Sequence, residues 1–146
     1  MTNTPRFLLA CCLLIIAALL VVGSVSHGVS RHLVQTAPLW FAIVLGLRHS
    51  QWSKWTALPC FFFWLLVMTF IWLFLLGWTR IITGTFSPTE IAMTAIVGLA
   101  SLAGILNAFY TKTSMAWWKA ITVMLAIELL QVAALRISFL PAIAHR

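Results

Sequence analysis

Five long apolar stretches dominate this sequence of 146 residues. The first, residues 7–23, reads FLLACCLLIIAALLVVG and carries no charged residue. A helix that crosses a bilayer needs about 20 mainly apolar residues, within a range of roughly 17 to 25. The other stretches are residues 33–47, 56–78, 89–110 and 117–141. The sequence therefore predicts an all-α, polytopic transmembrane helix bundle of about five spans, forming a single integral membrane domain over residues 1–146.

Two of these stretches leave a bundle of four spans as an alternative. Residues 33–47 are few for a crossing, and they include Gln35, Thr36 and Pro38. Residues 7–23 follow Arg6 and precede the small residues at 24–26, an arrangement also found in cleaved signal peptides. Their apolar run is longer than the roughly 7 to 15 residues of a typical signal peptide, which favours an uncleaved anchor.

The composition excludes an ordinary soluble domain. Hydrophobic residues make up 63% of the chain and charged residues 8%, whereas soluble domains have roughly 45–50% and 25%. The formal net charge of +7 comes from nine Lys and Arg against two acidic residues. These basic residues stand singly between apolar stretches, which fits membrane topology and lipid head groups better than nucleic acid. We therefore expect the lipid bilayer, and not a nucleic acid, to be their partner.

The distribution of basic residues between the loops predicts the orientation. With five spans and a cytoplasmic N-terminus, the cytoplasmic side carries the larger share of Lys and Arg, as is typical of membrane proteins. That side holds Arg6, Arg48, Lys54, Lys112 and Lys119, and the outer side holds Arg31, Arg80, Arg136 and Arg146. Tryptophan residues accompany the two lysines that border spans, as in interfacial aromatic belts. We expect a multi-pass protein of a bacterial-type inner membrane with its N-terminus in the cytoplasm.

The motif SPTE predicts the start of the fourth helix. Ser87 can act as the N-cap, and Pro88 then occupies the first helical position, where its missing N–H costs nothing. Glu90 falls at the third helical position and can accept a hydrogen bond from the Ser87 amide, completing a capping box. Glu90 therefore has a structural explanation.

The other acidic residue, Glu128, lies in the middle of an apolar stretch. It is midway between Lys119 and Arg136, about 13 Å from each at a rise of ~1.5 Å per residue. An acidic side chain at the bilayer centre costs about 2.5 to 3.5 kcal/mol on insertion scales, so some contact must offset this cost. Gln131 lies three residues further on, on the same face of the helix. We interpret Glu128 and Gln131 as an intramembrane polar site.

The role of this polar site stays open at the level of sequence. Thr69 and Ser101 lie near the middle of their own stretches and are the possible midplane hydrogen-bond partners of Glu128. One interpretation is a proton or cation site, because intramembrane carboxylates often mark transport paths. The others are docking to a partner subunit and interhelical hydrogen bonding inside the bundle.

Small residues in the fourth stretch predict close helix packing. Thr94 and Gly98 are four residues apart, as are Ala100 and Gly104, and such spacings let helix backbones approach closely in lipid. This pattern favours contacts inside the bundle, with a homo-oligomer as an alternative.

Candidates for catalysis or cofactor binding are few. The chain contains no Asp, and it has no GxSxG, HExxH or nucleotide-binding loop. His27, His32 and His145 are expected on one side of the membrane, but their spacing matches no closed metal motif. The three cysteines lie in apolar sequence and are expected to be buried thiols. We predict no enzymatic activity, no cofactor and no metal.

The run IELLQ at residues 127–131 resembles a short motif of the VanZ-like membrane proteins. The likeness covers these five residues only, and the acidic and Gly/Arg-rich sequence that follows the motif in that family is missing, so no function is carried over. The expected function is therefore a non-enzymatic accessory or assembly subunit of a membrane complex. The alternative is a small oligomeric transporter or proton-coupled permeation protein that uses Glu128.

Overall fold

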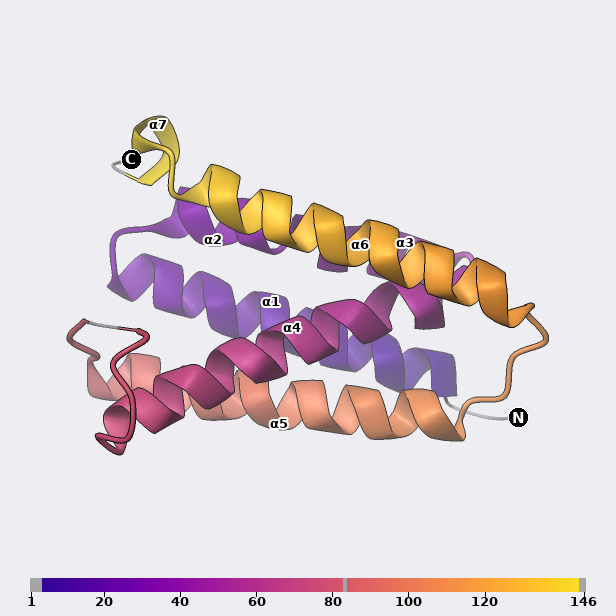
Figure 1. Cartoon of the computed structure of the whole chain (residues 1–146), viewed down its shortest axis with the longest axis horizontal. Helices are drawn as coiled ribbons and strands as arrows, with labels where there is room; N and C mark the ends of the chain where they lie inside the picture. The colour runs from indigo at the N-terminus through magenta and orange to yellow at the C-terminus, as the bar shows by residue number, and fades with distance from the viewer. Residues whose placement is uncertain (1–3, 83, 145–146) are drawn as a thin grey trace.

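Four long helices form the frame of the protein, whose computed structural model describes residues 4–82 and 84–144 (Figure 1). They are α1 (Thr4–Val25), α4 (Trp52–Leu75), α5 (Pro88–Tyr110) and α6 (Trp117–Ser138). Three shorter helices complete the fold: α2 (Val29–Gln35), α3 (Ala37–Leu47) and α7 (Pro141–Ala144). All regular structure in the described ranges is helical. Each long helix is long and apolar enough to cross a membrane.

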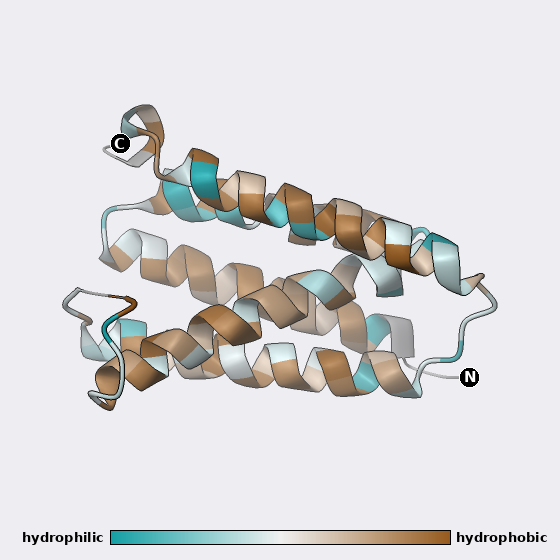
Figure 2. Cartoon of the chain, in the orientation of Figure 1, coloured by the Kyte–Doolittle hydropathy of each residue, from teal (hydrophilic) through white to brown (hydrophobic). Residues whose placement is uncertain are grey.

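The chain runs back and forth between two ends of the bundle. At the N-terminal end, α1, α4 and α6 begin and α3 and α5 finish; at the opposite end, α2 and α5 begin and α1, α4 and α6 finish (Figure 1). Figure 2 shows apolar residues along the lengths of the helices and more hydrophilic residues towards the two ends. Residues 33–47, where the sequence predicts one span, do not form a single helix. Thr36 separates α2 from the 11-residue apolar helix α3.

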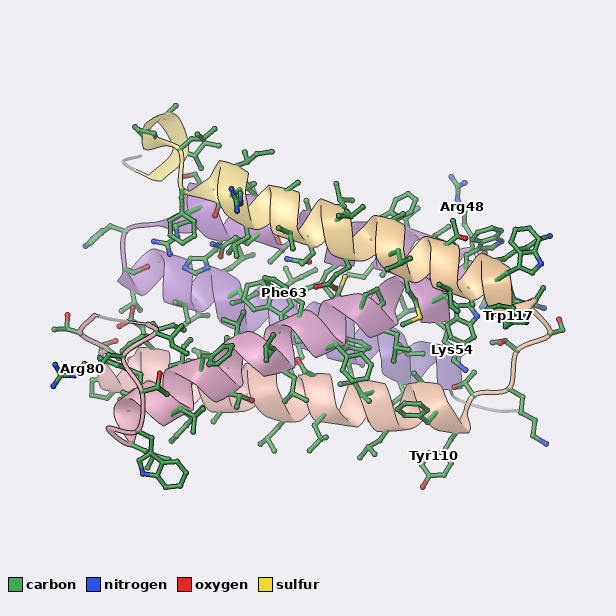
Figure 3. All side chains as sticks on the ribbon, viewed as in Figure 1. Arg48, Lys54, Phe63, Arg80, Tyr110 and Trp117 are labelled. Carbon is green, nitrogen blue, oxygen red and sulfur yellow. The ribbon has the colours of Figure 1, made fainter. Side chains whose placement is uncertain are left out.

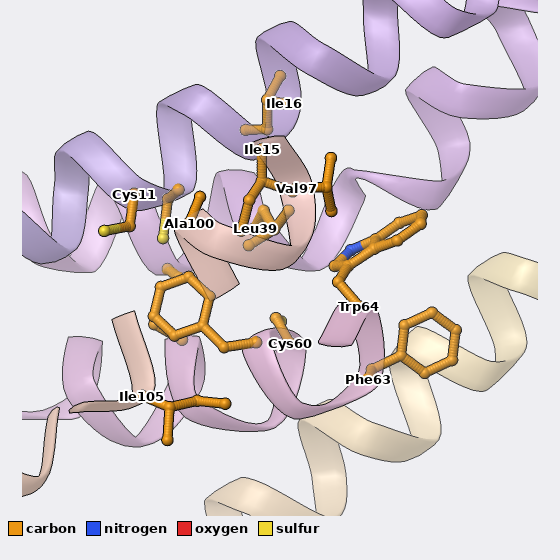
Figure 4. Packing of buried hydrophobic residues seen from close by; sticks show 14 of the residues in the cluster. Cys11, Ile15, Ile16, Leu39, Cys60, Phe63, Trp64, Val97, Ala100 and Ile105 are labelled. Carbon is orange, nitrogen blue, oxygen red and sulfur yellow. The ribbon is translucent and has the colours of Figure 1, made fainter. Parts of the chain in front are cut away.

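The core lies where α1, α4 and α5 meet, with α3 beside them. Apolar side chains and thiols from these helices interlock in Figure 4. Among the most deeply buried are Ile15, Leu39, Cys60 and Phe61, each with none of its surface exposed. The thiols of Cys11, Cys12 and Cys60 are all free and buried in this core.

A glycine allows α5 to approach α4 closely. A methyl group built on Gly104 would lie 2.5 Å from the ring of Phe61, a distance that real Cβ atoms do not tolerate. Ala100, four residues earlier, is also buried in the core. Gly98 is different, because the nearest atom to a methyl group there would be the Cβ of Met68 at 3.8 Å. The close approach expected from the small residues is thus made at Gly104, inside the bundle.

Helix α6 lies at the edge of the bundle. It packs against α2, α3 and α4, and over the described residues it does not contact α5, the helix that precedes it. Of the four long helices it is the least buried, with 22% of its most apolar segment inside the bundle against 39–44% for the others. The segment between α5 and α6 is held at the N-terminal end by the Lys54 Nζ, which donates to the Thr111 carbonyl at 2.6 Å.

Candidate functional site

The break between α2 and α3 leaves a backbone carbonyl without its helical partner. In a continuous helix the Gln35 carbonyl would accept from the Leu39 amide, four residues on. The Leu39 amide donates instead to the Thr36 carbonyl, at 2.9 Å. Pro38, three residues on from Gln35, has no N–H to offer. The Gln35 carbonyl is therefore free to accept a hydrogen bond from outside its own helix.

Gln131 of α6 supplies this hydrogen bond. Its side-chain Nε2 donates to the Gln35 carbonyl at 3.0 Å, and the Gln131 side chain is completely buried. A second bond joins the same elements, from Gln35 Nε2 to Ser138 Oγ at 2.9 Å. Ser138 Oγ in turn donates to the Leu135 carbonyl. This polar network connects α6 to the break, and leaving the buried carbonyl unpaired would cost about 1–3 kcal/mol.

Glu128 has different surroundings from Gln131, although both lie on α6. Ile127 and Gln131 face the bundle and are buried, whereas Glu128 is half-buried at the border of that face. Its neighbours Leu125 and Leu129 are 61% and 72% exposed. The carboxyl forms no hydrogen bond or ion pair with the described residues, although it lies within electrostatic range of the Cys60 thiol. The two polar residues therefore do not act as one site.

Neither hydroxyl expected beside Glu128 is placed there. Thr69 is exposed on α4, and its hydroxyl donates to the Leu65 carbonyl of its own helix at 2.8 Å. Ser101 is fully buried on α5, and α5 does not contact α6 over the described residues. The sequence gives the depth of both residues along their helices, and depth alone does not say which neighbour a side chain faces.

The start of α5 contains the capping box expected from the sequence. The Glu90 amide donates to Ser87 Oγ at 3.3 Å, and the Ser87 amide donates to the Glu90 carboxylate at 2.7 Å. Pro88 opens the helix. The box fixes Glu90 at the end of the bundle opposite the N-terminus, beside the last turns of α1, α4 and α6 and the first turn of α2.

A cavity of about 420 Å³ lies between these elements. Most of its wall is apolar, and its polar side chains include Arg31, His32, Gln35 and Glu90. Its lining residues are Leu19, Val22, Ser26, Arg31, His32, Gln35, Trp64, Val67, Met68, Ile71, Ile82, Phe86, Glu90, Met93, Thr94, Val97, Leu135 and Phe139. Glu128 does not line this cavity.

The two basic side chains of the cavity come from the first turn of α2. The Arg31 guanidinium lies over the ring of Phe139, 4.2 Å from its centre. Burial and the neighbouring Arg31 lower the pKa of His32, and this effect outweighs the opposite influence of Gln35 and Glu90. His32 is therefore a neutral imidazole near pH 7, and Arg31 supplies the positive charge.

The histidines do not assemble a metal site within the described ranges. No group of three or more His, Cys, Asp or Glu side chains is placed to hold a metal ion there. His27 occupies the turn between α1 and α2 with a left-handed backbone, φ 55°. His145, the third expected imidazole, lies outside the described residues.

Sequence reasoning missed Gln35 and Arg31 as parts of a polar region. Pro38 was a usable signal for a break in this stretch, because a proline inside an apolar helix interrupts the backbone hydrogen bonds of the preceding turn. Nothing in the sequence indicated that a hydrogen-bond donor to Gln35 would come from α6. Comparison of the chain with known protein families, with curated proteins and with solved structures finds no match.

Proposed function

We propose that this protein is an integral inner-membrane protein that serves as an accessory or assembly subunit of a larger membrane complex. In this proposal it docks to its partner through the outer face of α6, around Glu128. The observation that carries the proposal is that Glu128 is half-buried on the least buried long helix, without a hydrogen-bond partner in the described chain.

The membrane placement is supported by the four long apolar helices. A fifth crossing over residues 33–47 agrees with the parallel course of α1 and α4, because the chain must return through α2 and α3 to the end where α4 begins. The N-terminal end carries Arg48, Lys54 and Trp117, and Arg80 lies at the other end (Figure 3). Because cytoplasmic loops are enriched in Lys and Arg, we assign the N-terminal end to the cytoplasm. Arg146, counted on the outer side, lies outside the described residues.

The energetics of Glu128 favour a partner. In the proposed orientation it lies near the bilayer midplane, where a lone acidic side chain costs about 2.5 to 3.5 kcal/mol. Gln131 does not offset this cost in the structure, because its Nε2 donates to the Gln35 carbonyl and no hydrogen bond joins it to Glu128 in the described chain. A hydrogen-bond donor or a cation from a neighbouring helix would do so.

The chemistry of Glu128 favours a different protein over a second copy of this chain. In a two-fold symmetric dimer formed through this face, the two Glu128 carboxyls would approach each other, which disfavours two charged carboxylates. We therefore expect a transmembrane helix that presents Lys, Arg, His or a neutral donor at the same depth. The transporter alternative would need a path to Glu128, and the cavity at the opposite end does not reach it.

The test is co-purification of the tagged full chain from native membranes in mild detergent. Glu128→Leu is compared with wild type and with Leu99→Ala, a matched control that changes a 68% exposed leucine of α5, a helix that does not contact α6 over the described residues. We expect a stoichiometric membrane partner with wild type and Leu99→Ala, and its loss with Glu128→Leu. Glu128→Gln separates two modes, because it preserves a neutral hydrogen bond and abolishes an ion pair.

A photo-reactive residue at position 125 then identifies the partner helix by cross-linking. The cross-linked segment must contain a polar or basic residue near its middle. A partner that stays bound to Glu128→Leu, or recovery of the protein alone or as a homo-oligomer, would contradict the docking proposal. Proton flux in liposomes that is present in wild type and absent in Glu128→Gln would replace it with the transport alternative.

A further inference from the structure

The cavity at the end opposite the N-terminus has the size and lining of a ligand site. Its volume of about 420 Å³ falls within the roughly 300–1,000 Å³ of small-molecule sites. Such sites combine a mainly apolar wall with a few convergent polar groups. Here the apolar wall comes from α1, α4, α5, α6 and the segment between α4 and α5, and the charged and imidazole groups come from α2 and the start of α5.

Three nitrogen atoms that belong to residues lining the cavity are buried and have no hydrogen-bond partner in the described part of the chain. They are Arg31 Nε, His32 Nδ1 and Trp64 Nε1. Trp64 is only 3% exposed, and the nitrogens of Arg31 and Trp64 can act only as donors. Buried polar atoms in folded proteins nearly always have partners, so each exception requires an explanation. Two of them are donors from residues that line this one cavity, where a ligand with acceptor oxygens would provide the missing partners.

Glu90 adds an opposite charge to the same cavity. One of its carboxylate oxygens accepts from the Ser87 amide in the capping box. No ion pair joins Glu90 to Arg31 in the structure over residues 4–82 and 84–144, although both line the cavity. The site therefore presents one cation and one anion that are not paired with each other. A head group that carries both a phosphate and an ammonium is complementary to this arrangement.

We propose that the cavity binds a membrane phospholipid with an amine-bearing head group. The lipid phosphate lies against the Arg31 guanidinium, and the ammonium lies towards the Glu90 carboxylate. Trp64 is closer to the middle of α4, so its indole N–H donates to an ester carbonyl deeper in the membrane. Part of one acyl chain occupies the apolar wall around Met68 and Val97. This site is independent of the docking face, because Glu128 does not line the cavity.

Native mass spectrometry of the full chain in detergent tests this proposal. The purified protein is titrated with phosphatidylethanolamine and, separately, with phosphatidylglycerol of the same acyl chains. The two lipids share the phosphate and the chains, and they differ in that only the first carries an amine. We expect one tightly bound phosphatidylethanolamine per chain and weaker binding of phosphatidylglycerol.

Three conservative variants remove one contact each. Arg31→Gln removes the cation and is expected to weaken lipid binding on the order of tenfold, the usual effect of losing a charge-assisted hydrogen bond. Trp64→Phe removes the N–H and keeps an aromatic ring, so we expect a smaller loss. Glu90→Gln keeps a side chain that can complete the capping box and is expected to abolish the preference for the amine. Arg80→Gln, an exposed cation at the same end that does not line the cavity, is the control.

The outcomes separate the proposal from its alternatives. The absence of a discrete bound lipid, or equal binding by Arg31→Gln and Arg80→Gln, would overturn it. A preference for phosphatidylglycerol in wild type would overturn the assignment of Glu90 to an ammonium. Elution volume and thermal unfolding of each variant are compared with wild type. If Arg31→Gln misfolds, binding of phosphatidylethanolamine by Trp64→Phe that equals wild type would overturn the proposal, and weaker binding by a folded Trp64→Phe would support it.

Discussion

The hydrogen bond between Gln131 and the Gln35 carbonyl makes a quantitative prediction about stability. Gln131→Leu keeps a side chain of similar size and deletes the 3.0 Å bond that closes the break between α2 and α3. The Gln35 carbonyl is then buried without a partner, at a cost of about 1–3 kcal/mol. Interhelical hydrogen bonds measured within membranes are worth less, about 0.6 kcal/mol on average and up to about 1.7.

One atom of the Gln131 side chain offsets part of this cost. Gln131 Oε1 is buried and already has no hydrogen-bond partner in the described chain. Leucine removes this unpaired acceptor, which recovers part of the loss. The net expectation is a destabilisation of about 1 kcal/mol. Gln131→Ala should cost more than Gln131→Leu, because it also leaves a cavity at a fully buried position.

The assay is reversible unfolding in mixed micelles with increasing sodium dodecyl sulfate, followed by loss of helical signal. A second variant makes the unfolding test more specific. Gln131 binds the backbone of Gln35 and not its side chain, so Gln35→Leu keeps the bond to Gln131 and removes the bond to Ser138. Because both side chains belong to one network, the effects of Gln131→Leu and Gln35→Leu should not simply add, and a double-mutant cycle should give a coupling free energy of about 0.5 kcal/mol or more. Unchanged or increased stability in Gln131→Leu, or strict additivity of the two changes, would refute this account.

Two further changes test the packing and the cavity. Gly104→Ala places a methyl group against the Phe61 ring and should destabilise the fold by about 1–3 kcal/mol, whereas Gly98→Ala, which has room, should be neutral or stabilising in the same unfolding assay. Burial and the nearby Arg31 hold the pKa of His32 below its ordinary value. The imidazole of His32 therefore binds a proton more readily in the unfolded chain than in the folded protein. Stability should fall as the pH drops below about 6.5. His32→Gln should make this fall less steep, as measured by denaturant midpoints between about pH 8 and pH 5. An equally steep fall in the variant would exclude His32 as its source.

The sequence predicted the elements whose causes are local. Apolar length alone indicates α1, α4, α5 and α6, because a helix that meets lipid on one side and protein on the other needs little polar patterning. The start of α5 followed from four adjacent residues of the capping box. Pro38 marks the second stretch as irregular, but the sequence does not predict that this stretch divides into α2 and α3.

The polar contacts between helices could not be predicted, because they join residues distant in the chain. Gln131 and Gln35 are 96 positions apart, and their hydrogen bond depends on α6 packing beside the break. The choice of Thr69 and Ser101 shows the same limit, since position along a helix gives the depth of a side chain but not the direction in which it points. The cavity draws its wall from five helices and from segments that connect them, an assembly that only the packed bundle brings together.

The contact between α1 and α5 has a consequence for how the protein is made. These two helices share an extensive interface, yet α2, α3 and α4 are synthesised between them. The face of α1 that packs against α5 therefore cannot be covered by this principal partner until the ribosome has completed α5. During that interval the nascent protein depends on lipid or on insertion factors to shield its first helix, and assembly of the core comes late in translation.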